Sequence, residues 1–372
     1  MKADVTPQLR TKGSAATEAA LSGKRVLFLV NQDLGGGVEY LARVIGQDLT
    51  ARGAICRTEF IYPSSDFSTQ QKLSYVASAA WRVARNAPDI LITFQPTASA
   101  VSAIAGLAGG CRRRIVHQSN SPSKSNAVVR ELDKLLGSIG AYTVTIANSR
   151  ATIAEFEHYP NAYRDRILLI EHGIPPPQFQ LAPTDILAKF SVPADGPILL
   201  TAARLDPQKG QQIIVSALRE LPGVRYVMAG AGPEQDALAR LAQSFGVADR
   251  VHFVGLLGRQ DLTDLYRAST LLVFPSVWET FGLAAVEAAM IGLPVIASDI
   301  PALREVLTSD GKTTARFVAS RSPYDWREAI SDSLASPQLS AASAGFATVI
   351  QDKYSEQRMI AGYAALYAEL FT

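Results

Sequence analysis

The stretch LLVFPSVWETFGLAAVEAAMIGLPVIA, residues 271–297, contains a complete strand–helix–strand pattern. The apolar run 271–274 has the length of a buried strand, and residues 282–291 have the length and composition of a helix. Gly292 and Pro294 end that helix before the second apolar run begins. Two buried strands joined by a helix predict a parallel sheet with crossover helices, which is an α/β fold.

The same alternation of short apolar runs and helix-length stretches extends in both directions along the chain. It is interrupted once, where Pro175, Pro176 and Pro177 exclude a helix or a central strand. Strands are expected before this break at residues 25–30, 89–94, 114–117, 142–147 and 167–170, and after it at 197–203, 224–229, 251–254, 271–274 and 295–297. Two such halves predict two Rossmann-like domains facing each other across a cleft that strand-end loops line.

Four segments are therefore expected in the 372 residues. Residues 1–23 lack an apolar centre, which predicts a disordered leader rather than a secretory signal. Residues 24–174 and 175–350 are the two predicted Rossmann-like domains. Residues 351–372 are apolar at helical spacing, which predicts a terminal helix that crosses back and packs on the N-terminal domain.

Composition excludes several classes of protein. The chain is 48% hydrophobic and 19% charged, as in ordinary globular proteins, and no apolar run is long enough for a membrane-spanning helix. Cys56 and Cys111 are too few for a disulfide scaffold or a thiolate metal site, which favours reduced thiols in a cytoplasmic protein. None of the four His is spaced for a helical metal site.

Charge is distributed unevenly. Residues 1–174 carry 20 Lys and Arg against 14 Asp and Glu, whereas the remainder carries 16 against 20. A basic first half could meet an anionic acceptor or a membrane surface, although an ordinary solvated face would have the same composition. Arg112–Arg114 is the three-residue basic run: if exposed it could help to dock an anionic bilayer, and otherwise it is a solvated strand entrance.

The helix that opens at Gly282 offers a binding site for an anion. Its first backbone N–H groups have no partner within the helix, and the helix dipole favours negative charge there, which suits a diphosphate. Glu279 lies just before the helix and Glu287 lies about a turn and a half inside it. Their carboxylates suit sugar hydroxyls on one side of the phosphates and ribose hydroxyls on the other.

Two cations follow the first strand of the second half. Arg204 and Lys209 are separated by a turn at Pro207, so both side chains can converge on a pair of phosphates. They would supply the charge that a leaving nucleoside diphosphate needs. No Asp-x-Asp pair follows a strand in a way that predicts a magnesium site, so we expect a reaction without a metal or other cofactor.

These motifs resemble family 4 of the retaining glycosyltransferases, the group 1 type with the two-domain GT-B fold. The signature of that family is two Glu separated by seven residues that include Phe-Gly-Leu, and it stands here as Glu279, Phe281, Gly282, Leu283 and Glu287. Further marks of the family are Arg-Leu followed by Lys-Gly, at residues 204–205 and 209–210, and Gly-x-Gly-Pro at 230–233. The resemblance is strongest over residues 197–307 and weaker over 24–174.

The resemblance implies transfer of a hexosyl unit, with retention, from a UDP- or GDP-hexose to a glycan or lipid-linked glycan acceptor. In bacteria such chains build surface polysaccharide in the cytoplasm or at the inner face of the membrane. The first domain would then lie on the acceptor side and the second would bind the nucleotide sugar. No nucleic-acid partner is implied.

The resemblance also assigns roles to individual residues. Glu279 would bind the transferred sugar and Glu287 the ribose, while Arg204 and Lys209 would hold the diphosphate. His117 would lie near the 6-position of the donor sugar; otherwise it is a strand-end His bonded to backbone. The remaining residues of the expected donor site are Gly36, Gly37, Gly232, Phe281, Gly282, Leu283 and Ala284.

Three other functions are compatible with parts of the sequence. An oxidoreductase would need a third glycine of the dinucleotide fingerprint after residues 35–37, and Tyr40 stands in its place. An epimerase of GT-B fold shares the architecture but lacks the paired Glu with Phe-Gly-Leu. A non-catalytic nucleotide-sugar-binding protein would be expected to lose Arg204, Lys209 or Glu279, and all three are present.

Overall fold

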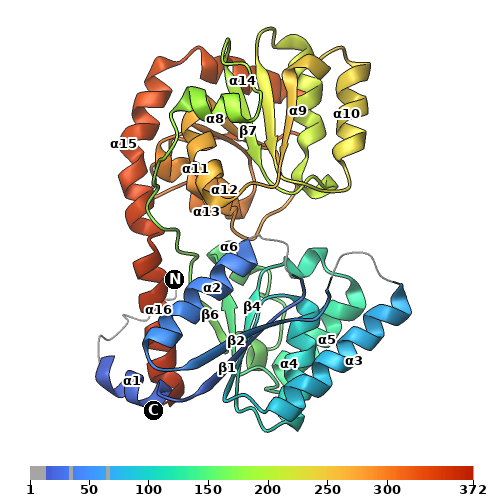
Figure 1. Ribbon diagram of the computed structural model, residues 1–372, viewed down its shortest axis with the longest axis vertical. Coiled ribbons are helices and arrows are strands. Elements are labelled where there is room, and N and C mark those ends of the chain that lie inside the picture. Colours follow the sequence, from blue (N-terminus) through green and yellow to red (C-terminus); the bar gives the residue numbers. More distant parts are fainter. Residues whose placement is uncertain (1–13, 33–36, 64–67, 372) are drawn as a thin grey trace. The chain divides into compact units, whose positions relative to one another are not determined.

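The computed structural model describes residues 14–32, 37–63 and 68–371 (Figure 1). The chain divides into two compact units. The first unit comprises residues 1–173 and 356–372, and the second comprises residues 174–355. Each unit is a parallel six-stranded sheet with helices on both faces, so the expected α/β class with two Rossmann-like halves is confirmed.

The sheet of the first unit has the strand order β2-β1-β3-β4-β5-β6. Its strands are β1 (Arg25–Val30), β2 (Ile55–Phe60), β3 (Ile90–Thr93), β4 (Arg113–Gln118), β5 (Val144–Ala147) and β6 (Ile167–Leu169). All neighbours are parallel, and Val26 of β1 lies opposite Cys56 of β2 on one side and Ile90 of β3 on the other. The order of the strands reverses between β1 and β3, which is where sheets of this kind bind ligands.

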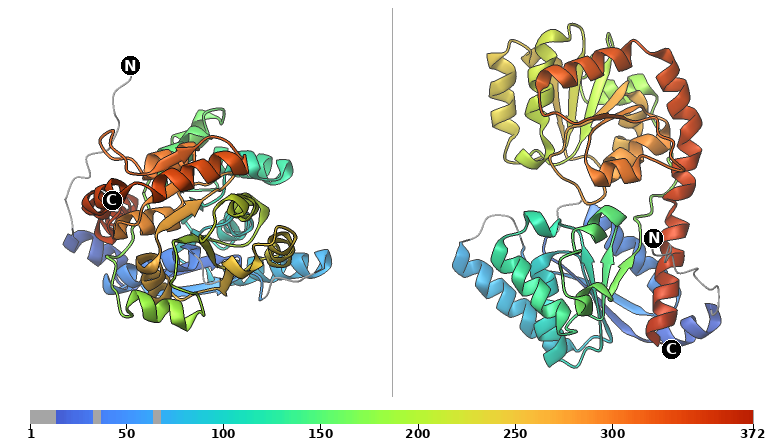
Figure 2. Two further views of the ribbon diagram at one scale, coloured as in Figure 1. Left: turned by 90° about the horizontal axis from the view of Figure 1, so that it is seen from above. Right: turned by 180° about the vertical axis from the view of Figure 1, so that it is seen from behind.

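Helices cover both faces of this sheet. Those of the first unit are α1 (Ser14–Leu21), α2 (Gly37–Ala51), α3 (Thr69–Asn86), α4 (Pro96–Ala108), α5 (Ala127–Ser138), α6 (Arg150–Ala154), α7 (Asn161–Arg164) and α16 (Glu356–Phe371). On one face α2 and α16 pack against Val26, Phe28 and Val30, and on the other α3 and α4 pack against Leu27 and Leu29. Successive side chains of β1 therefore point into two different apolar cores, one on each face of the sheet. Helices α3, α4 and α5 lie on the same side of the sheet (Figures 1 and 2).

The last helix packs on the first unit through an apolar stripe. Met359, Tyr363, Leu366 and Tyr367 of α16 are buried in the same core as Val26 and Phe28. The helix begins at Glu356 rather than at residue 351, because the preceding helix α15 continues to residue 353.

The prediction of a disordered leader over residues 1–23 is wrong for its second part. Ser14–Leu21 forms helix α1, which packs against α16, and Leu21 is completely buried in the core of the first unit. The sequence signal was weak because this short helix contributes few apolar residues, and its stability comes from tertiary packing. Residues 1–13 lie outside the described part of the chain.

The sheet of the second unit has the strand order β12-β11-β10-β7-β8-β9. Its strands are β7 (Ile198–Ala202), β8 (Arg225–Ala229), β9 (Val251–Gly255), β10 (Leu271–Phe274), β11 (Val295–Ser298) and β12 (Arg316–Val318). Counted within the unit this is the Rossmann order 3-2-1-4-5-6 read backwards. The order reverses between β7 and β10, which pair at Leu199 with Leu271 and at Leu200 with Leu272.

Two layers of helices enclose this second sheet. Its α-helices are α8 (Pro183–Lys189), α9 (Gln211–Ala217), α10 (Gln235–Ser244), α11 (Arg259–Ala268), α12 (Leu283–Ile291), α13 (Pro301–Val306), α14 (Pro323–Leu334) and α15 (Pro337–Lys353). One layer contains α8, α11, α12, α13 and α15, and the other contains α9, α10 and α14. The unit begins at Ile174, whose N–H donates to the carbonyl of Tyr354 at 2.8 Å.

Candidate functional site

The predicted donor residues of the second unit gather where its strand order reverses. The carboxyl ends of β7 and β10 are neighbours, and the loops that follow them span residues 203–210 and 275–282. The first loop carries Arg204 and Lys209, and the second carries Glu279. Two segments about 70 residues apart in sequence are thus brought together by the sheet topology.

Gln208 ties the two loops together. Its carbonyl accepts the N–H of Val277 at 2.7 Å, and its side-chain amide donates to the carbonyl of Trp278 at 2.9 Å. These two bonds fix the residue before Lys209 against the residue before Glu279. The sequence did not single out Gln208, because a polar residue in a turn gives no sign of its partner.

Lys209 and Glu279 form a direct ion pair. The Lys209 Nζ lies 2.6 Å from Glu279 Oε1, and the two side chains are only 14% and 9% exposed. Ser276, which is buried, donates its hydroxyl to the same oxygen at 2.8 Å. The sequence placed both charged groups in one site, and the structure brings them into contact; Ser276 was missed.

Arg204 lies at the same loop but points into solvent. Its guanidinium pairs with Asp206 at 2.9 Å, and its backbone carbonyl accepts the side-chain amide of Gln211 at 2.8 Å. The backbone is therefore anchored while the charged end remains exposed. An incoming anion could draw this side chain away from Asp206, since an exposed ion pair contributes little stability.

The first turn of α12 presents backbone donors next to this pair. Gly282 adopts a left-handed conformation with φ of 88°, and a Cβ at this position would lie 2.5 Å from the side chain of Leu303. The N–H groups of Ala285 and Val286 donate to the carbonyl of Gly282. The N–H groups of Leu283 and Ala284 precede the first bond of the helix, which is the arrangement that binds a phosphate.

Glu287 is held by two side chains of α11. The hydroxyl of Tyr266 donates to Glu287 Oε2 at 3.1 Å, and Arg259 lies 3.3 Å from Oε1. Burial raises the pKa of the Glu287 carboxyl, and Arg259 and Tyr266 counteract this rise. A cavity of about 200 Å³ adjoins all three side chains and the linker Pro175–Pro177. The sequence missed the role of Tyr266.

Other predicted donor residues occupy ordinary structural positions. Gly232 follows β8 and packs against the backbone of Leu205. Phe281 is buried, and its ring meets the edge of Tyr354 at 5.2 Å between centroids. Gly37 is the first residue of α2, whereas Gly36 lies outside the described residues.

His117 belongs to the first unit, near the carboxyl end of β4. Its ring lies 4.3 Å from the ring of Phe94 and 5.8 Å from that of Tyr363, measured between centroids, and it is buried. Burial, with a smaller contribution from nearby His172, lowers the pKa of His117 to about 3. The side chain is therefore neutral at physiological pH, and it would meet a ligand as a neutral hydrogen-bonding group.

The strand-order reversal of the first unit holds a polar pair that the sequence did not reveal. The N–H of Asn31, just after β1, donates to the side-chain oxygen of Gln95, just after β3, at 2.6 Å. The Asn31 side chain in turn accepts the N–H of Ala98 at 3.2 Å. These contacts fix the residue that follows β1 at the edge of the sheet where a ligand is expected.

The basic run Arg112–Arg114 is not an exposed patch, so the interpretation that docks it on a membrane is wrong. Arg114 is buried and donates to the carbonyls of Cys111 and Ala141. Arg113 donates to the carbonyl of Leu370 and stacks on the ring of Phe371. Of the three, Arg112 alone is exposed. Backbone carbonyls can accept the hydrogen bonds of a buried guanidinium group. The number of charges in a sequence therefore does not show whether an Arg is exposed.

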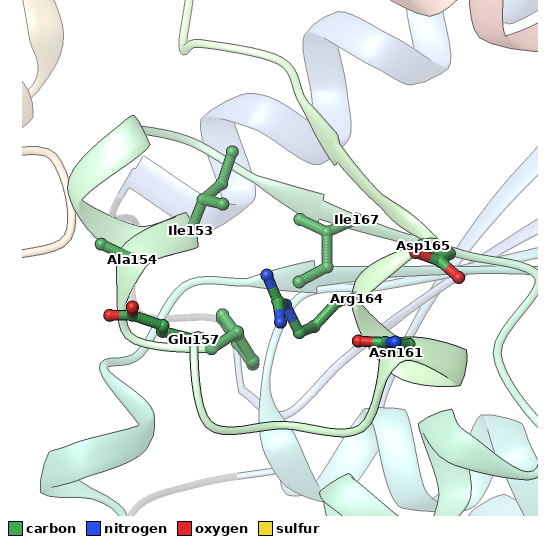
Figure 3. Close-up of a pocket in the computed structure, with 8 residues that line it drawn as sticks. Ile153, Ala154, Glu157, Asn161, Arg164, Asp165 and Ile167 are labelled. Carbon is green, nitrogen blue, oxygen red and sulfur yellow. The ribbon is translucent and has the colours of Figure 1, made fainter. Parts of the chain in front are cut away.

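A separate hollow of about 580 Å³ lies between α6, α7 and β6 in the first unit. Figure 3 shows Arg164, Glu157 and Asp165 around it, with Ile153 and Ile167 on its walls. The two carboxylates offset the Arg164 charge, so the hollow does not favour an anion as the α12 start does. It was not anticipated from the sequence.

The described residues contain neither a cluster of metal-ligating side chains nor a helix suited to span a membrane. In residues 14–32, 37–63 and 68–371, no group of three or more His, Cys, Asp or Glu lies close enough to hold a metal ion. Within the same ranges, no helix has both the length and the apolar composition needed to cross a bilayer.

Residues 184–346 match the family model described as glycosyl transferases group 1. This part of the chain therefore has the sequence pattern of that family. It includes the ion pair Lys209–Glu279, the start of α12 and Glu287. The resemblance inferred from the paired Glu is therefore confirmed for the second unit.

Relatives and solved structures extend the comparison beyond the second unit. The D-inositol 3-phosphate glycosyltransferase of Mycolicibacterium smegmatis is 34% identical over 246 residues, which cover 64% of this chain and 54% of that protein. The chain thus spans about half the length of the curated relatives that it matches.

Two solved structures show the fold. The HepE protein of Anabaena, in complex with UDP and glucose, has a TM-score of 0.77 at 21% identity, over 93% of this chain and 99% of that chain. Sucrose-phosphate synthase of Thermosynechococcus elongatus has a TM-score of 0.78 at 20% identity, over 94% and 99%. The expected GT-B fold class is confirmed.

Proposed function

We propose that this protein is a retaining glycosyltransferase that moves a hexosyl unit from a UDP- or GDP-hexose to a glycan or lipid-linked glycan. The observation that carries the proposal is the partly buried ion pair of Lys209 and Glu279, in the loops that precede the first turn of α12. This site offers a cation and backbone donors to a diphosphate, and a carboxylate to sugar hydroxyls. The solved HepE complex with UDP and glucose supports the choice of a nucleotide sugar as donor.

The leaving group determines the chemistry of the site. As the bond between the sugar and the diphosphate breaks, negative charge grows on the phosphate oxygen. Lys209, Arg204 and the N–H groups at the start of α12 would stabilise that charge without a metal. We expect the same oxygen to take the proton of the acceptor hydroxyl, which attacks from the same face. Retention comes from the family resemblance.

The two Glu would hold the ends of the donor. When a phosphate pairs with Lys209, Glu279 would keep its hydrogen bond from Ser276. Its carboxylate would therefore stay in position for the hydroxyls of the transferred sugar. Glu287, oriented by Tyr266, would accept the ribose hydroxyls. Each carboxylate is thus fixed by the protein before the donor arrives.

We assign the acceptor to the first unit. In the sequence Gly36 and Gly37 follow β1 of this unit, and His117 lies near the end of β4; the family resemblance implies that His117 lies near the donor sugar. The free thiols of Cys56 and Cys111 suit a reducing compartment, which supports a cytoplasmic reaction. A lipid-linked acceptor would bring the protein to the inner face of the membrane, in bacterial surface polysaccharide synthesis.

A donor screen followed by a matched pair of variants tests the proposal. Thermal shifts with UDP- and GDP-hexoses identify the donor, and donor hydrolysis without acceptor then reports turnover. Lys209→Ala should lower kcat by about 100-fold, because the transition-state charge loses a partner. Lys189→Ala is the control, since Lys189 also pairs with a carboxylate, that of Asp261 at 2.7 Å, but this pair joins α8 to α11 and involves neither of the two loops that carry Lys209 and Glu279.

Several results would count against the proposal. Near-normal turnover by Lys209→Ala would show that Lys209 does not stabilise the leaving group, which is the role on which the proposal depends. Binding without hydrolysis or transfer would indicate a non-catalytic nucleotide-sugar-binding protein, and an altered free nucleotide sugar would indicate an epimerase. NMR of the product glycoside tests retention, and full activity in excess chelator tests independence from metal.

A further inference from the structure

The linker at the start of the second unit contains a stiff segment that has no backbone donors. Pro175, Pro176 and Pro177, which we call the proline run, lack an N–H group, and each ring fixes φ at about −65°. The run therefore cannot be held in place by donors of its own, and its position depends on the residues on either side. Before the run, the N–H of Ile174 donates to the carbonyl of Tyr354 at 2.8 Å.

The anchor after the proline run is Asp264 of α11. This residue is completely buried, and its two carboxylate oxygens accept the backbone N–H groups of Gln180 at 2.9 Å and Leu181 at 3.1 Å. One of these oxygens also accepts the side-chain amide of Gln260 at 3.2 Å. Burial raises the pKa of the Asp264 carboxyl, but the three donors outweigh burial and lower that pKa below its usual range. Asp264 therefore holds the linker as an ionised acceptor.

Two neighbours of Asp264 on the same face of α11 reinforce this attachment. Gln260, one turn earlier in the helix, donates its amide to the carbonyl of Gln178 at 2.9 Å. Arg267, about one turn later, donates to the carbonyl of Leu181. The segment that directly follows the proline run is thus fixed to α11 at several points.

The adjacent face of α11 belongs to the candidate donor site. Arg259 and Tyr266 share that face, by their spacing along the helix, and both contact Glu287. These three side chains and the proline run line the cavity of about 200 Å³, and all of its lining residues belong to the second unit. Helix α11 therefore connects two walls of one cavity. One of its faces holds Glu287, and the other holds the proline run through Asp264.

We propose that Asp264 is a positioning residue for the donor and that it acts through the proline run. The proposal rests on the proposed function, in which Glu287 accepts the ribose hydroxyls. The base is attached to that ribose, and the proline rings offer it an apolar wall of the cavity next to Glu287. A linker released from Asp264 would hold this wall in place in only a fraction of the molecules. The apparent Kd of the donor rises as that fraction falls, while the chemical step is unchanged.

A purely structural role is the other explanation for the buried carboxylate. Asp264 would then stabilise the packing of the linker against α11, and its loss would lower the free energy of unfolding without changing donor affinity. The proline run distinguishes the two explanations, because only a positioning residue depends on the wall that it holds.

The experiment compares the full-length wild type with four variants. Asp264→Asn keeps the shape of the side chain, but its amide can accept only one of the two linker N–H groups. Pro176→Gly with Pro177→Gly loosens the wall itself, and the third variant combines these changes with Asp264→Asn. Asp195→Asn is the control for loss of a carboxylate, because Asp195 pairs with Arg225 at the start of β8, at the amino edge of the sheet.

Three measurements are made on each protein. Calorimetry gives the Kd of UDP and of GDP, which carry the ribose and the base without depending on the identity of the sugar. Donor hydrolysis gives KM and kcat with the nucleotide sugar that the thermal-shift screen selects. Hydrogen exchange reports on the backbone amides of Gln180 and Leu181, which Asp264 protects.

Asp264→Asn should raise the Kd of the preferred nucleoside diphosphate and the donor KM about fivefold, with kcat nearly unchanged. Exchange at the amides of Gln180 and Leu181 should become faster. The combined variant should bind within about twofold of Pro176→Gly with Pro177→Gly, because Asp264 then has no stiff wall to position. Asp195→Asn should bind as the wild type does.

Arg267→Ala is measured in place of Asp264→Asn if that variant does not fold. It removes one bond to the same segment from an exposed side chain that does not line the cavity. Its Kd for the nucleoside diphosphate should rise about twofold, since the remaining bonds hold the wall in place in a larger fraction of the molecules.

Three results would overturn the inference. An unchanged Kd in Asp264→Asn, together with a lower free energy of unfolding in urea, would assign the carboxylate a structural role. Fold-changes that multiply in the combined variant would show that Asp264 acts independently of the proline run. A wild type that binds neither UDP nor GDP would refute the proposed function and this inference together. A wild type that binds but does not turn over would refute the proposed function alone, because the Kd values still test Asp264.

Discussion

Replacing Tyr266 by Phe isolates one contact of the candidate donor site. The hydroxyl of Tyr266 donates to Glu287 Oε2 at 3.1 Å, and the ring is buried beneath α12. Phe fills the same space, so the variant removes a hydrogen bond and leaves the packing intact. If Glu287 holds the ribose, the variant should bind the donor less tightly.

The size of the effect follows from the surroundings of Glu287. A hydrogen bond to a charged group contributes about 1.5–3 kcal/mol, and the lower end applies because the Glu287 side chain is 22% exposed and water can replace part of the bond. A loss of about 1.4 kcal/mol is a tenfold change in an equilibrium constant. We therefore expect the donor KM to rise about tenfold while kcat stays nearly constant, because ribose binding is the same in ground and transition state.

The pH dependence supplies a second readout. Burial already raises the pKa of Glu287, and the Tyr266 hydroxyl counteracts that rise. Without the hydroxyl the pKa climbs further, so the carboxylate becomes protonated at a higher pH as the solution is acidified. In Tyr266→Phe the loss of donor affinity on acidification should therefore begin at a higher pH than in the wild type.

Tyr226→Phe is the matched control for this measurement. Tyr226 is also buried in the second unit, but its hydroxyl lies 2.8 Å from Thr201 Oγ1, away from Glu287. Steady-state donor hydrolysis as a function of pH gives KM and kcat for all three proteins. An unchanged KM in Tyr266→Phe, or an equal rise in both variants, would refute the role given to Glu287 and its partner.

Two further predictions concern Ser276 and the buried His residues. Ser276→Ala should lower kcat roughly fivefold, which corresponds to about 1 kcal/mol, because Glu279 Oε1 loses one of its two hydrogen-bond donors. Unchanged kinetics would contradict the role of Ser276 in positioning Glu279. Burial lowers the pKa of His117 to about 3 and that of His172 to about 4 from the usual value of about 6.5, so the unfolded chain binds more protons between these values. The free energy of unfolding should therefore fall as pH drops from about 6.5 towards 4, and it should fall less in His117→Gln; urea titrations at several pH values measure both.

The interior strands of both sheets could be predicted from the sequence, as could the edge strands β6 and β9, but the other two edge strands could not. Residues 26–30 and 271–274 are continuous apolar runs, because strands flanked on both sides are buried on both faces. The two strands that were missed, β2 (Ile55–Phe60) and β12 (Arg316–Val318), are both edges. Along β2 only Glu59 is buried, so the apolar signal is absent.

The meeting of Lys209 with Glu279 could also be anticipated, whereas the partners of Glu287 could not. Topology brings the ends of neighbouring strands together whatever side chains follow, so residues just after β7 and β10 had to converge. Tyr266 reaches Glu287 from one helix to another, and this contact depends on how α11 and α12 pack. That packing angle is set by many side chains at once.

The ion pair of Lys209 and Glu279 also restricts what the site can bind. Both side chains are under 15% exposed, and removing one partner from a pair with so little contact with water leaves the charge of the other poorly compensated. A free phosphate would satisfy Lys209 but would leave Glu279 with only Ser276 as a donor. A sugar attached to a diphosphate supplies an anion for the cation and hydroxyls for the carboxylate together. Separating Lys209 from Glu279 therefore costs the least free energy when the ligand carries both an anion and hydroxyl groups. The proposed donor, a nucleotide sugar, carries both.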